Sequence, residues 1–295
     1  MDATRHQSFS GLFGFTARIW RANAVPLVTV GFLGSAIALL AAALIEGMHS
    51  TFSFSGAAFG ILVRGSDSGT HLSLSSPMLA TGLITIAASS WASATMVVML
   101  LTHVRRGRRA SVRALGCGLR YWPWVAAVVL LEDLLNRGVY LVELIWPNLL
   151  ALTGLPGLAV SLLFMTVFVF YVQEIVASRR NGFAALAGSW TLVLRTGVWR
   201  VFGNRLLFAV CLLPVLLPEL VLVLHFGAYS AAGSGLSQLL SGVIAAPLLT
   251  AFTTVMYLLA RGERKQVASV LRSGGQGRAR AGLRSTAGSP PRSLS

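Results

Sequence analysis

The sequence has few charged residues for its length, and acidic residues are the scarcest of them. Of 295 residues, 11% are charged and 55% are hydrophobic, and 9 Asp and Glu stand against 24 Lys and Arg. A soluble globular domain carries about 25% charged residues, so this composition excludes an ordinary soluble domain. The net charge of +15 also argues against an acidic or disordered binding protein. The composition therefore predicts a membrane protein.

Cysteine is scarce too, and the two residues present are poorly placed for pairing. Cys117 lies in a basic linker and Cys211 in an apolar run, which is not the spacing of a disulfide framework. Both are predicted to be free thiols. Lysine is nearly absent, with 23 Arg to 1 Lys, and the abundance of Ala, Gly, Leu and Val beside it suggests a bacterial source with a GC-rich genome.

Recognisable catalytic and metal-binding motifs are also missing. The chain contains no His-Glu-x-x-His, Gly-x-Ser-x-Gly or Walker sequence, and these are the motifs that mark metalloproteases, serine hydrolases and nucleotide hydrolases. Its histidines are scattered over both predicted sides of the membrane, which argues against a multi-histidine metal site. We therefore expect no catalytic residue, no metal ligand and no cofactor. The histidines are His6, His49, His71, His103 and His225.

Long apolar runs are what the sequence has in abundance. A helix needs about 20 apolar residues to cross a hydrocarbon core of roughly 30 Å. Five runs reach this length, and a sixth, Tyr121–Trp146, is interrupted by charged residues. The pattern predicts an all-α fold, a polytopic bundle of six transmembrane helices over residues 1–265, with both termini on one side. The five uninterrupted runs are Ala24–Ile45, Met78–Leu101, Leu158–Val176, Leu206–Leu224 and Leu236–Ala260.

Basic residues are unevenly distributed between the segments that join these runs. Twenty-two of the 24 fall before the first run, in the second and fourth linkers or after the last run, and only Arg64 and Arg137 fall on the other side. Because cytoplasmic loops carry the excess of Lys and Arg, we expect a multi-pass protein of the bacterial cytoplasmic membrane with cytoplasmic N- and C-termini. A signal peptide ending near Ala43 is the alternative for the first run, which is longer than a typical signal-peptide core.

A threefold repeat is visible in the order of these segments, and it predicts three helical hairpins. Each repeat opens with an amphipathic segment on the predicted cytoplasmic side. Aromatic residues and leucines at helical spacing beside arginines are typical of interfacial helices; the alternative is a loop that packs on the protein itself. The apolar positions are Phe9, Leu12, Phe13, Ile19 and Trp20, then Val112, Leu115, Leu119 and Trp122, then Phe183, Leu186, Trp190, Val193 and Leu194. The arginines predicted to contact lipid headgroups are Arg18, Arg21, Arg113, Arg120, Arg195 and Arg200.

The basic character of the chain raises the question of its partners. Membrane topology already accounts for the positions of the arginines, and no nucleic-acid-binding module accompanies them, so anionic lipid headgroups are the predicted partner and nucleic acid is not. Residues 266–295 are rich in Arg, Gly, Ser and Pro, which predicts a disordered basic tail in the cytoplasm. A protein partner and a homo-oligomer both stay open.

The interrupted run Tyr121–Trp146 holds the most polar stretch expected inside the membrane. Glu132 and Asp133 fall 11 and 12 residues into the run, a depth of about 17 Å at 1.5 Å per residue. Ionised groups there are costly unless paired, and Asp133 has Arg137 one helical turn away. These three residues, joined by Glu219 of the fifth run, form a candidate transport or ion-binding site. The alternative is a helix that surfaces early and carries an acidic outer rim.

The linker between the fourth and fifth runs carries a family resemblance. The residues concerned are Glu174, Ser178-Arg179-Arg180, Gly182–Leu186, Ser189–Leu192 and Trp199–Gly203, together with Phe13–Pro26 and Gly107–Arg120. They resemble the corresponding segments of a family of six-helix bacterial membrane proteins that includes the membrane domain of some glycerophosphoryl diester phosphodiesterases. The resemblance implies that catalysis in those fused proteins belongs to a separate soluble barrel with acidic and His metal ligands, for which this sequence has no counterpart.

These features together favour a non-catalytic function. We expect an integral membrane protein that acts as a scaffold or accessory factor in a membrane process. A transporter of a small solute, an ion or a lipid, using the polar site of the third run, is the alternative hypothesis. Glu174, near Arg179 and Arg180 at the end of the fourth run, is expected to form an ion pair at the cytoplasmic edge.

Overall fold

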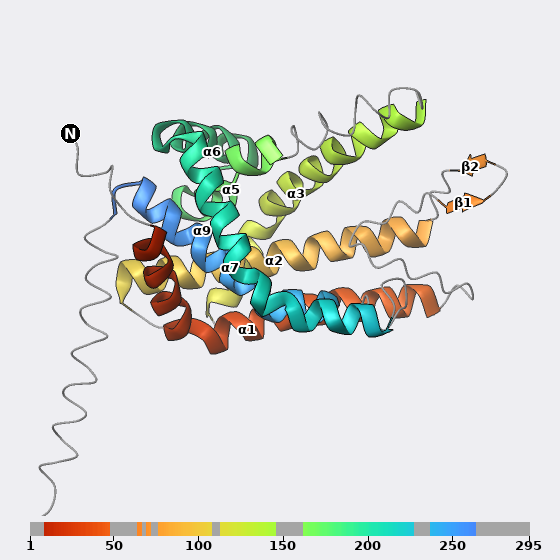
Figure 1. The fold of residues 1–295 in the computed structure, drawn as a ribbon, viewed down its shortest axis with the longest axis horizontal. Helices are drawn as coiled ribbons and strands as arrows, with labels where there is room; N and C mark the ends of the chain where they lie inside the picture. The colour runs from red at the N-terminus through yellow and green to blue at the C-terminus, as the bar shows by residue number, and fades with distance from the viewer. Residues whose placement is uncertain are drawn as a thin grey trace, which may run out of the picture.

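The computed structural model describes residues 9–47, 64–66, 69–71, 76–107, 113–145, 162–226 and 237–263. These residues are helical apart from short connections and one small antiparallel hairpin (Figure 1). The predicted all-α class is thus confirmed for them, whereas the predicted tail, 266–295, lies outside the described residues. The elements are α1 (Phe9–Gly47), β1 (Arg64–Ser66), β2 (Gly69–His71), α2 (Ser76–Arg106), α3 (Arg113–Ile145), α5 (Tyr171–Ser178), α6 (Gly182–Thr196), α7 (Val198–Phe226), the π-helical turn η2 (Ser241–Ala245) and α9 (Ala246–Ala260).

Four helices among the described residues are long and apolar enough to cross a membrane. A fifth candidate is the pair α6 and α7, whose axes meet at an angle of 94°. Their length and hydropathy are compatible with a membrane-spanning protein, since about 20 apolar residues in a helix cross a hydrocarbon core. The four single helices are Phe9–Ile45, Ala80–Arg106, Ala114–Leu131 and Ser237–Ala260.

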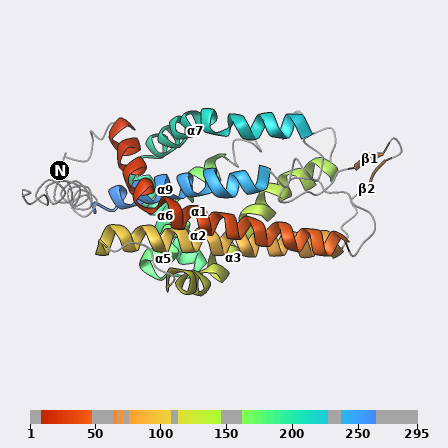
Figure 2. The same cartoon turned by 90° about the horizontal axis from the view of Figure 1, so that it is seen from below.

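The bundle has two distinct ends. The β1–β2 hairpin, which pairs Arg64 with His71 and Ser66 with Gly69, lies at one end of the long helices (Figures 1 and 2). It falls in the long loop predicted between the first two runs. α2 and α9 finish at the opposite end, where Arg105, Arg106 and Arg261 follow their apolar parts. We call this the arginine end.

Helix α1 joins the first amphipathic segment to the first apolar run through a kink. Asn23 leaves helical geometry (φ −124°, ψ 15°), and Pro26 follows one turn later and cannot donate a backbone hydrogen bond. The buried Asn23 Nδ2 donates to the carbonyl of Ile19 at 2.9 Å. The first amphipathic segment therefore turns away from the run, as the bent start of the red helix shows in Figure 2.

This first amphipathic segment differs from the prediction of an interfacial helix with its apolar face in lipid. Leu12 and Ile19 are buried in the protein core, and the ring of Phe9 packs 6.5 Å from that of Phe252 on α9. The segment is a helix, as predicted, but Leu12 and Ile19 pack on the protein instead of facing outward, whereas Phe13 is exposed. Arg18 and Arg21 on the other side of the helix are exposed.

The second amphipathic segment, from Arg113 on, has no boundary of its own. It continues into the third run as the single helix α3, with Pro123 inside it. α3 lies close to α2, because a Cβ on Gly118 would overlap the side chain of Thr95. Leu119, the next residue, is exposed and borders a hollow with Ala88 and Trp91 of α2.

The third amphipathic segment is a separate helix, α6. Its end is set by Gly197, which adopts a φ of +95° that L-residues rarely accept. Leu186 and Val193 face the protein core, whereas Phe183, Trp190 and Leu194 are exposed. The expected single apolar face is therefore two faces, one packed on the bundle and one free to meet a membrane.

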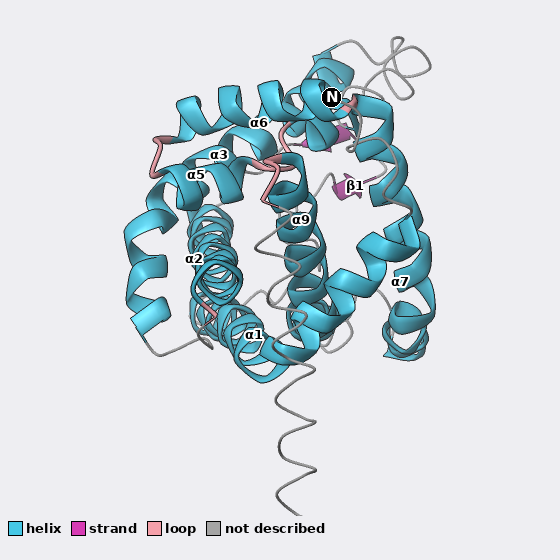
Figure 3. Ribbon diagram, turned by 90° about the vertical axis from the view of Figure 1, so that its left-hand side faces the viewer, coloured by secondary structure: helices cyan, strands magenta, loops and turns pink. Residues whose placement is uncertain are grey.

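Small residues let the central helices approach one another. A Cβ on Gly31 of α1 would collide with the carbonyl of Gly242 in η2, and one on Gly34 would lie 2.8 Å from the Cβ of Ala92 on α2. Such contacts replace the hydrophobic driving force that is absent between helices in lipid. The adjacent core is aromatic, with Phe208 of α7 stacked on Phe252 at 4.0 Å. Figure 3 shows α2 and α9 in the middle of the view and α1 below them.

Candidate functional site

The buried polar groups gather where the predicted fourth run, Leu158–Val176, is broken. Residues 162–167 are helical, residues 168–170 form a turn, and α5 follows. The buried hydroxyl of Ser189 on α6 donates to the carbonyl of Val167 at 3.0 Å and accepts from the N–H of Phe170 at 3.1 Å. One side chain thus bonds two backbone groups at the break in the helix.

A buried carboxylate lies one turn further along α5. Glu174 is 3% exposed, and its Oε2 accepts from the hydroxyl of Ser178 at 2.8 Å. Its Oε1 lies 3.4 Å from the hydroxyl of Tyr257 and 3.4 Å from Nη2 of Arg261. Arg261 Nη2 also donates to Ser178 at 2.9 Å. We call Glu174, Ser178, Tyr257 and Arg261 the carboxylate cluster.

The carboxylate cluster is held together from three elements. α5 supplies the acid, and α9 and the turn after it supply the phenol and the guanidinium. α6 makes room, because a Cβ on Gly188 would lie 3.2 Å from Cδ of Glu174. Glu174 does form an ion pair, but its partner is Arg261 at the end of the last helix and not the neighbouring Arg179 or Arg180 named from the sequence.

Gln173, the residue before Glu174, points toward α9 from the other side of α5. It is 2% exposed, and its Nε2 donates to Oγ1 of Thr253 at 3.0 Å. The Thr253 hydroxyl in turn donates to the carbonyl of Leu249 at 2.9 Å. The Thr253 hydroxyl can donate to Leu249 and accept from Gln173 at the same time, because a hydroxyl has one proton and two lone pairs.

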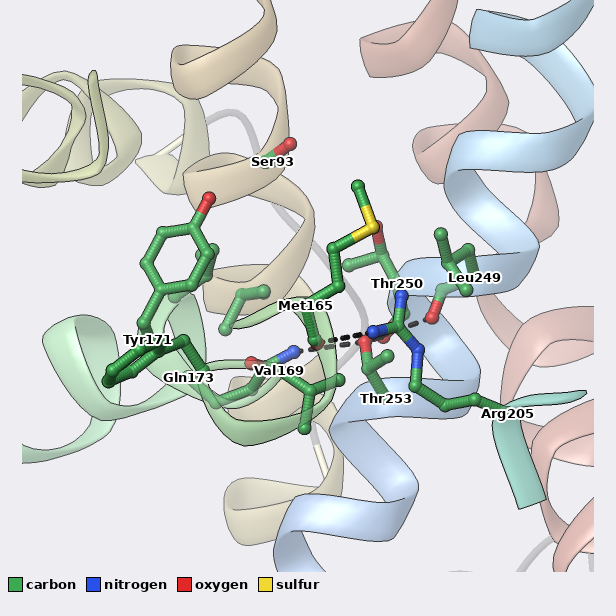
Figure 4. Close-up of a pocket in the computed structure, with 12 residues that line it drawn as sticks. Ser93, Met165, Val169, Tyr171, Gln173, Arg205, Leu249, Thr250 and Thr253 are labelled. Atoms are coloured by element: carbon green, nitrogen blue, oxygen red, sulfur yellow. Dashed lines mark hydrogen bonds between the residues drawn. The ribbon is translucent and has the colours of Figure 1, made fainter. Parts of the chain in front are cut away.

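A cavity of about 210 Å³ adjoins this amide. Figure 4 shows Gln173 and Arg205 pointing toward one another, with Thr253 between them in this view. Arg205 comes from α7, and its Nη1 donates to the carbonyl of Met165, just before the break. Ser93, Thr250 and Thr253 add hydroxyl groups to the wall, and Val97, Val169, Val172 and Leu249 add apolar ones. We call this the glutamine cavity.

The transport site predicted from the sequence lies mostly beyond these side chains. Glu132, Asp133 and Arg137 are all on α3, which is one continuous helix through them, and Glu219 is on α7. Their side chains lie outside the described residues.

The arginines predicted to contact lipid lie mainly on the surface. Arg18, Arg21, Arg120 and Arg195 are exposed, and Arg200 is half-buried. The side chain of Arg113 lies outside the described residues. A further surface pair joins α2 to the end of α9, where Arg105 Nη2 lies 2.7 Å from Oε1 of Glu263.

Three residues of the site did not emerge from the sequence. Gln173 is next to Glu174 and Arg205 follows Asn204, each beside an apolar stretch, and Ser189 was noted only as part of the family resemblance. Their partners lie 19 to 80 positions away in the chain, so spacing alone does not reveal them. No protein-family model, no curated protein and no solved structure matches this chain.

Proposed function

We propose that the protein is a non-catalytic integral membrane protein of the bacterial cytoplasmic membrane that acts as a scaffold or accessory factor. The observation that carries the membrane location is the exposure of large apolar side chains along two long helices. In water, an apolar surface of this extent promotes aggregation. In a bilayer the same side chains contact lipid acyl chains, which are apolar too. On α1 these residues are Val25, Phe32, Leu33, Ile37, Leu40 and Leu44, and on α7 they are Leu206, Leu207, Val210, Leu213, Leu217 and Val221.

Six crossings arranged as three hairpins are the architecture that we propose for this membrane domain. α1 with α2, α3 with the broken segment 162–178, and α7 with η2 and α9 then form the hairpins, each led by an amphipathic segment. Three successive hairpins, each led by an amphipathic segment, are the arrangement that the resemblance to the six-helix bacterial membrane family implies. The resemblance in turn supports a non-catalytic role. Anionic lipids are the proposed surface partner of the arginine end.

The scaffold role is supported by the carboxylate cluster. Its four side chains bond mainly to one another and tie α5 to the end of α9. A polar network that is satisfied internally rigidifies the elements that it joins. The arginine end is therefore suited to present a fixed surface to a partner.

Reporter fusions test the proposed topology. An alkaline phosphatase that is active only in the periplasm should stay inactive when fused after Arg109 or at Ser295, because both positions belong to arginine-rich segments. The same reporter fused near Ser68, in the loop between α1 and α2, should be active. Strong phosphatase activity at Ser295 would contradict six crossings with cytoplasmic termini.

A transporter is the second candidate function, and the continuity of α3 favours it. The helix runs unbroken from Arg113 to Ile145, which places Asp133 and Arg137 one turn apart, at the spacing of an ion pair. Of the chain's acidic residues, Glu132 and Asp133 are those predicted to lie deepest in the bilayer. We propose that they serve a transported ion, solute or lipid if they face the interior.

The melting temperatures of the unmodified protein, the two single variants and their double variant distinguish an Asp133–Arg137 pair inside the bundle from one on its outer rim. If the pair is interior, Asp133→Ala and Arg137→Ala should each lower the melting temperature in detergent more than the double variant does, because each leaves a lone charge in a low-dielectric setting. If the pair is exposed, the losses are small and add. Small additive shifts would remove the support for transport through α3.

A further inference from the structure

The oxygen of the Gln173 side chain is an acceptor without a donor. Its Oε1 is buried, and no donor among the described residues lies within hydrogen-bonding distance. The amide nitrogen donates to Thr253, so the oxygen is the atom of this amide that is left without a partner. Leaving a buried acceptor unpaired is destabilising, and native proteins rarely tolerate that without a ligand or an ordered water.

A positive charge lines the same glutamine cavity. The guanidinium of Arg205 forms part of its wall, and a guanidinium offers five N–H donors in a planar fork suited to phosphate oxygens. The cavity therefore combines a cation with an acceptor that needs a donor. A complementary ligand is an anion that also carries an O–H or N–H group.

The size of the glutamine cavity restricts what enters it. Its volume of about 210 Å³ corresponds to about seven water molecules at 30 Å³ each. This is less than the 300 to 1,000 Å³ typical of sites for drug-sized ligands. A headgroup fits such a space, whereas the acyl chains of a lipid must stay outside.

The surroundings of the cavity indicate from which side a ligand enters. Met165 and Leu249 of its wall are 42% and 38% exposed. Leu206 and Leu207, next to Arg205 in the chain, are more than 45% exposed as well. Because these apolar side chains belong to the surface that we assign to the membrane, the cavity is next to lipid rather than water.

We propose that the glutamine cavity binds the headgroup of an anionic phospholipid that carries a hydroxyl group. The phosphate accepts from Arg205, and the headgroup hydroxyl donates to Oε1 of Gln173. This is an internal site, separate from the surface arginines of the arginine end. The inference rests on the membrane location proposed above and adds a lipid class and two recognition residues.

Three synthetic lipids with the same acyl chains distinguish the contact of the phosphate with Arg205 from the contact of the headgroup hydroxyl with Gln173. Phosphatidylglycerol has the negative charge and hydroxyl donors, phosphatidylmethanol has the charge alone, and phosphatidylcholine has neither a net charge nor a donor. Binding of each lipid to the full-length protein in mild detergent is measured by native mass spectrometry. We expect phosphatidylglycerol to bind about tenfold more tightly than phosphatidylmethanol, as one hydrogen bond of about 1.4 kcal/mol gives, and phosphatidylcholine to bind least.

Matched variants assign these preferences to the cavity. Gln173→Leu should abolish the difference between the two anionic lipids, and Arg205→Gln should weaken both. Gln238→Leu changes the same residue type as Gln173→Leu outside the cavity lining and should leave the selectivity unchanged. Ser93→Leu, which fills the cavity from α2, should weaken all specific binding and gives a second readout if Gln173→Leu fails to fold.

Each remaining outcome would overturn the inference. Equal affinity for the two anionic lipids in the unmodified protein excludes a role for the Gln173 oxygen. Competition by millimolar inorganic phosphate that depends on Gln173, without selective lipid binding, makes the ligand a soluble anion. Protein that does not cofractionate with liposomes contradicts the membrane location as well, whereas cofractionation without lipid selectivity contradicts only the cavity site.

Discussion

Replacing Arg261 by alanine is expected to destabilise the protein by about 3 kcal/mol, because it removes the cation that faces a buried carboxylate. Glu174 is almost fully buried, so water cannot replace the lost partner. Ser178 and Tyr257 still donate to the carboxylate, but neither carries a compensating charge. The loss is measured as a lower melting temperature in detergent, with the unmodified protein in the same buffer.

Replacing Glu174 and replacing Arg261 are expected to lower the stability by unequal amounts. Glu174→Gln should destabilise less than Arg261→Ala, because the Arg261 side chain is about one-third exposed and is hydrated once its partner is neutral. The double variant should recover part of the loss of Arg261→Ala, since no buried charge is then left alone.

The pair of Arg105 and Glu263 provides the matched control for this prediction. It is also an Arg–Glu pair near the end of α9, but it is bonded at the surface. Exposed pairs contribute about 0 to 1 kcal/mol, so Arg105→Ala should change the melting temperature little. Equal shifts for Arg105→Ala and Arg261→Ala would show that the carboxylate cluster is not a buried network.

Ser189→Ala is expected to produce the second large loss, of about 2 to 3 kcal/mol. The hydroxyl bonds both the carbonyl of Val167 and the N–H of Phe170, and alanine leaves two buried backbone groups unpaired. The turn at 168–170 should then open more often. Amide hydrogen exchange at Phe170 measures this opening directly.

Thr191, two residues away on the same helix, is the control for Ser189. Its exposed hydroxyl donates to the carbonyl of Ala187 in its own helix, so Thr191→Ala should change stability by no more than about 0.5 kcal/mol. If Ser189→Ala lowered the stability as little as Thr191→Ala, the Ser189 hydroxyl would not be needed to pair the carbonyl of Val167 and the N–H of Phe170.

The long helices were the part of the fold that the sequence predicted well. Runs such as Ala24–Ile45 and Met78–Leu101 fall inside α1 and α2, because about 20 apolar residues in lipid have to satisfy their backbone internally as a helix. A helix over the second amphipathic segment was predicted as well, but its continuity with the run Tyr121–Trp146 was not. α3 continues through Pro123, so the amphipathic segment and the run are not separated by a turn.

The site was harder to predict because its geometry depends on distant residues. The segment 162–178 contains no Gly or Pro, and nothing local indicates the turn at 168–170. The hydroxyl that bonds this turn comes from Ser189, in the next helix. Leu186 and Val193 were likewise placed with Phe183 on one face, since helical spacing alone cannot tell a face covered by protein from one covered by lipid.

The contact between Gly31 and Gly242 also bears on how the protein is made. These residues lie 211 positions apart, and their helices touch so closely that no side chain fits between them. At a synthesis rate of about 5 to 20 residues per second, roughly 10 to 40 seconds pass between the synthesis of Gly31 and that of Gly242. During this interval α2 can already pack on Gly34 through Ala92, whereas Gly31 lacks the neighbour that lies against it in the finished bundle. The contact between the first and last helices therefore forms late, after the helices between them have been made.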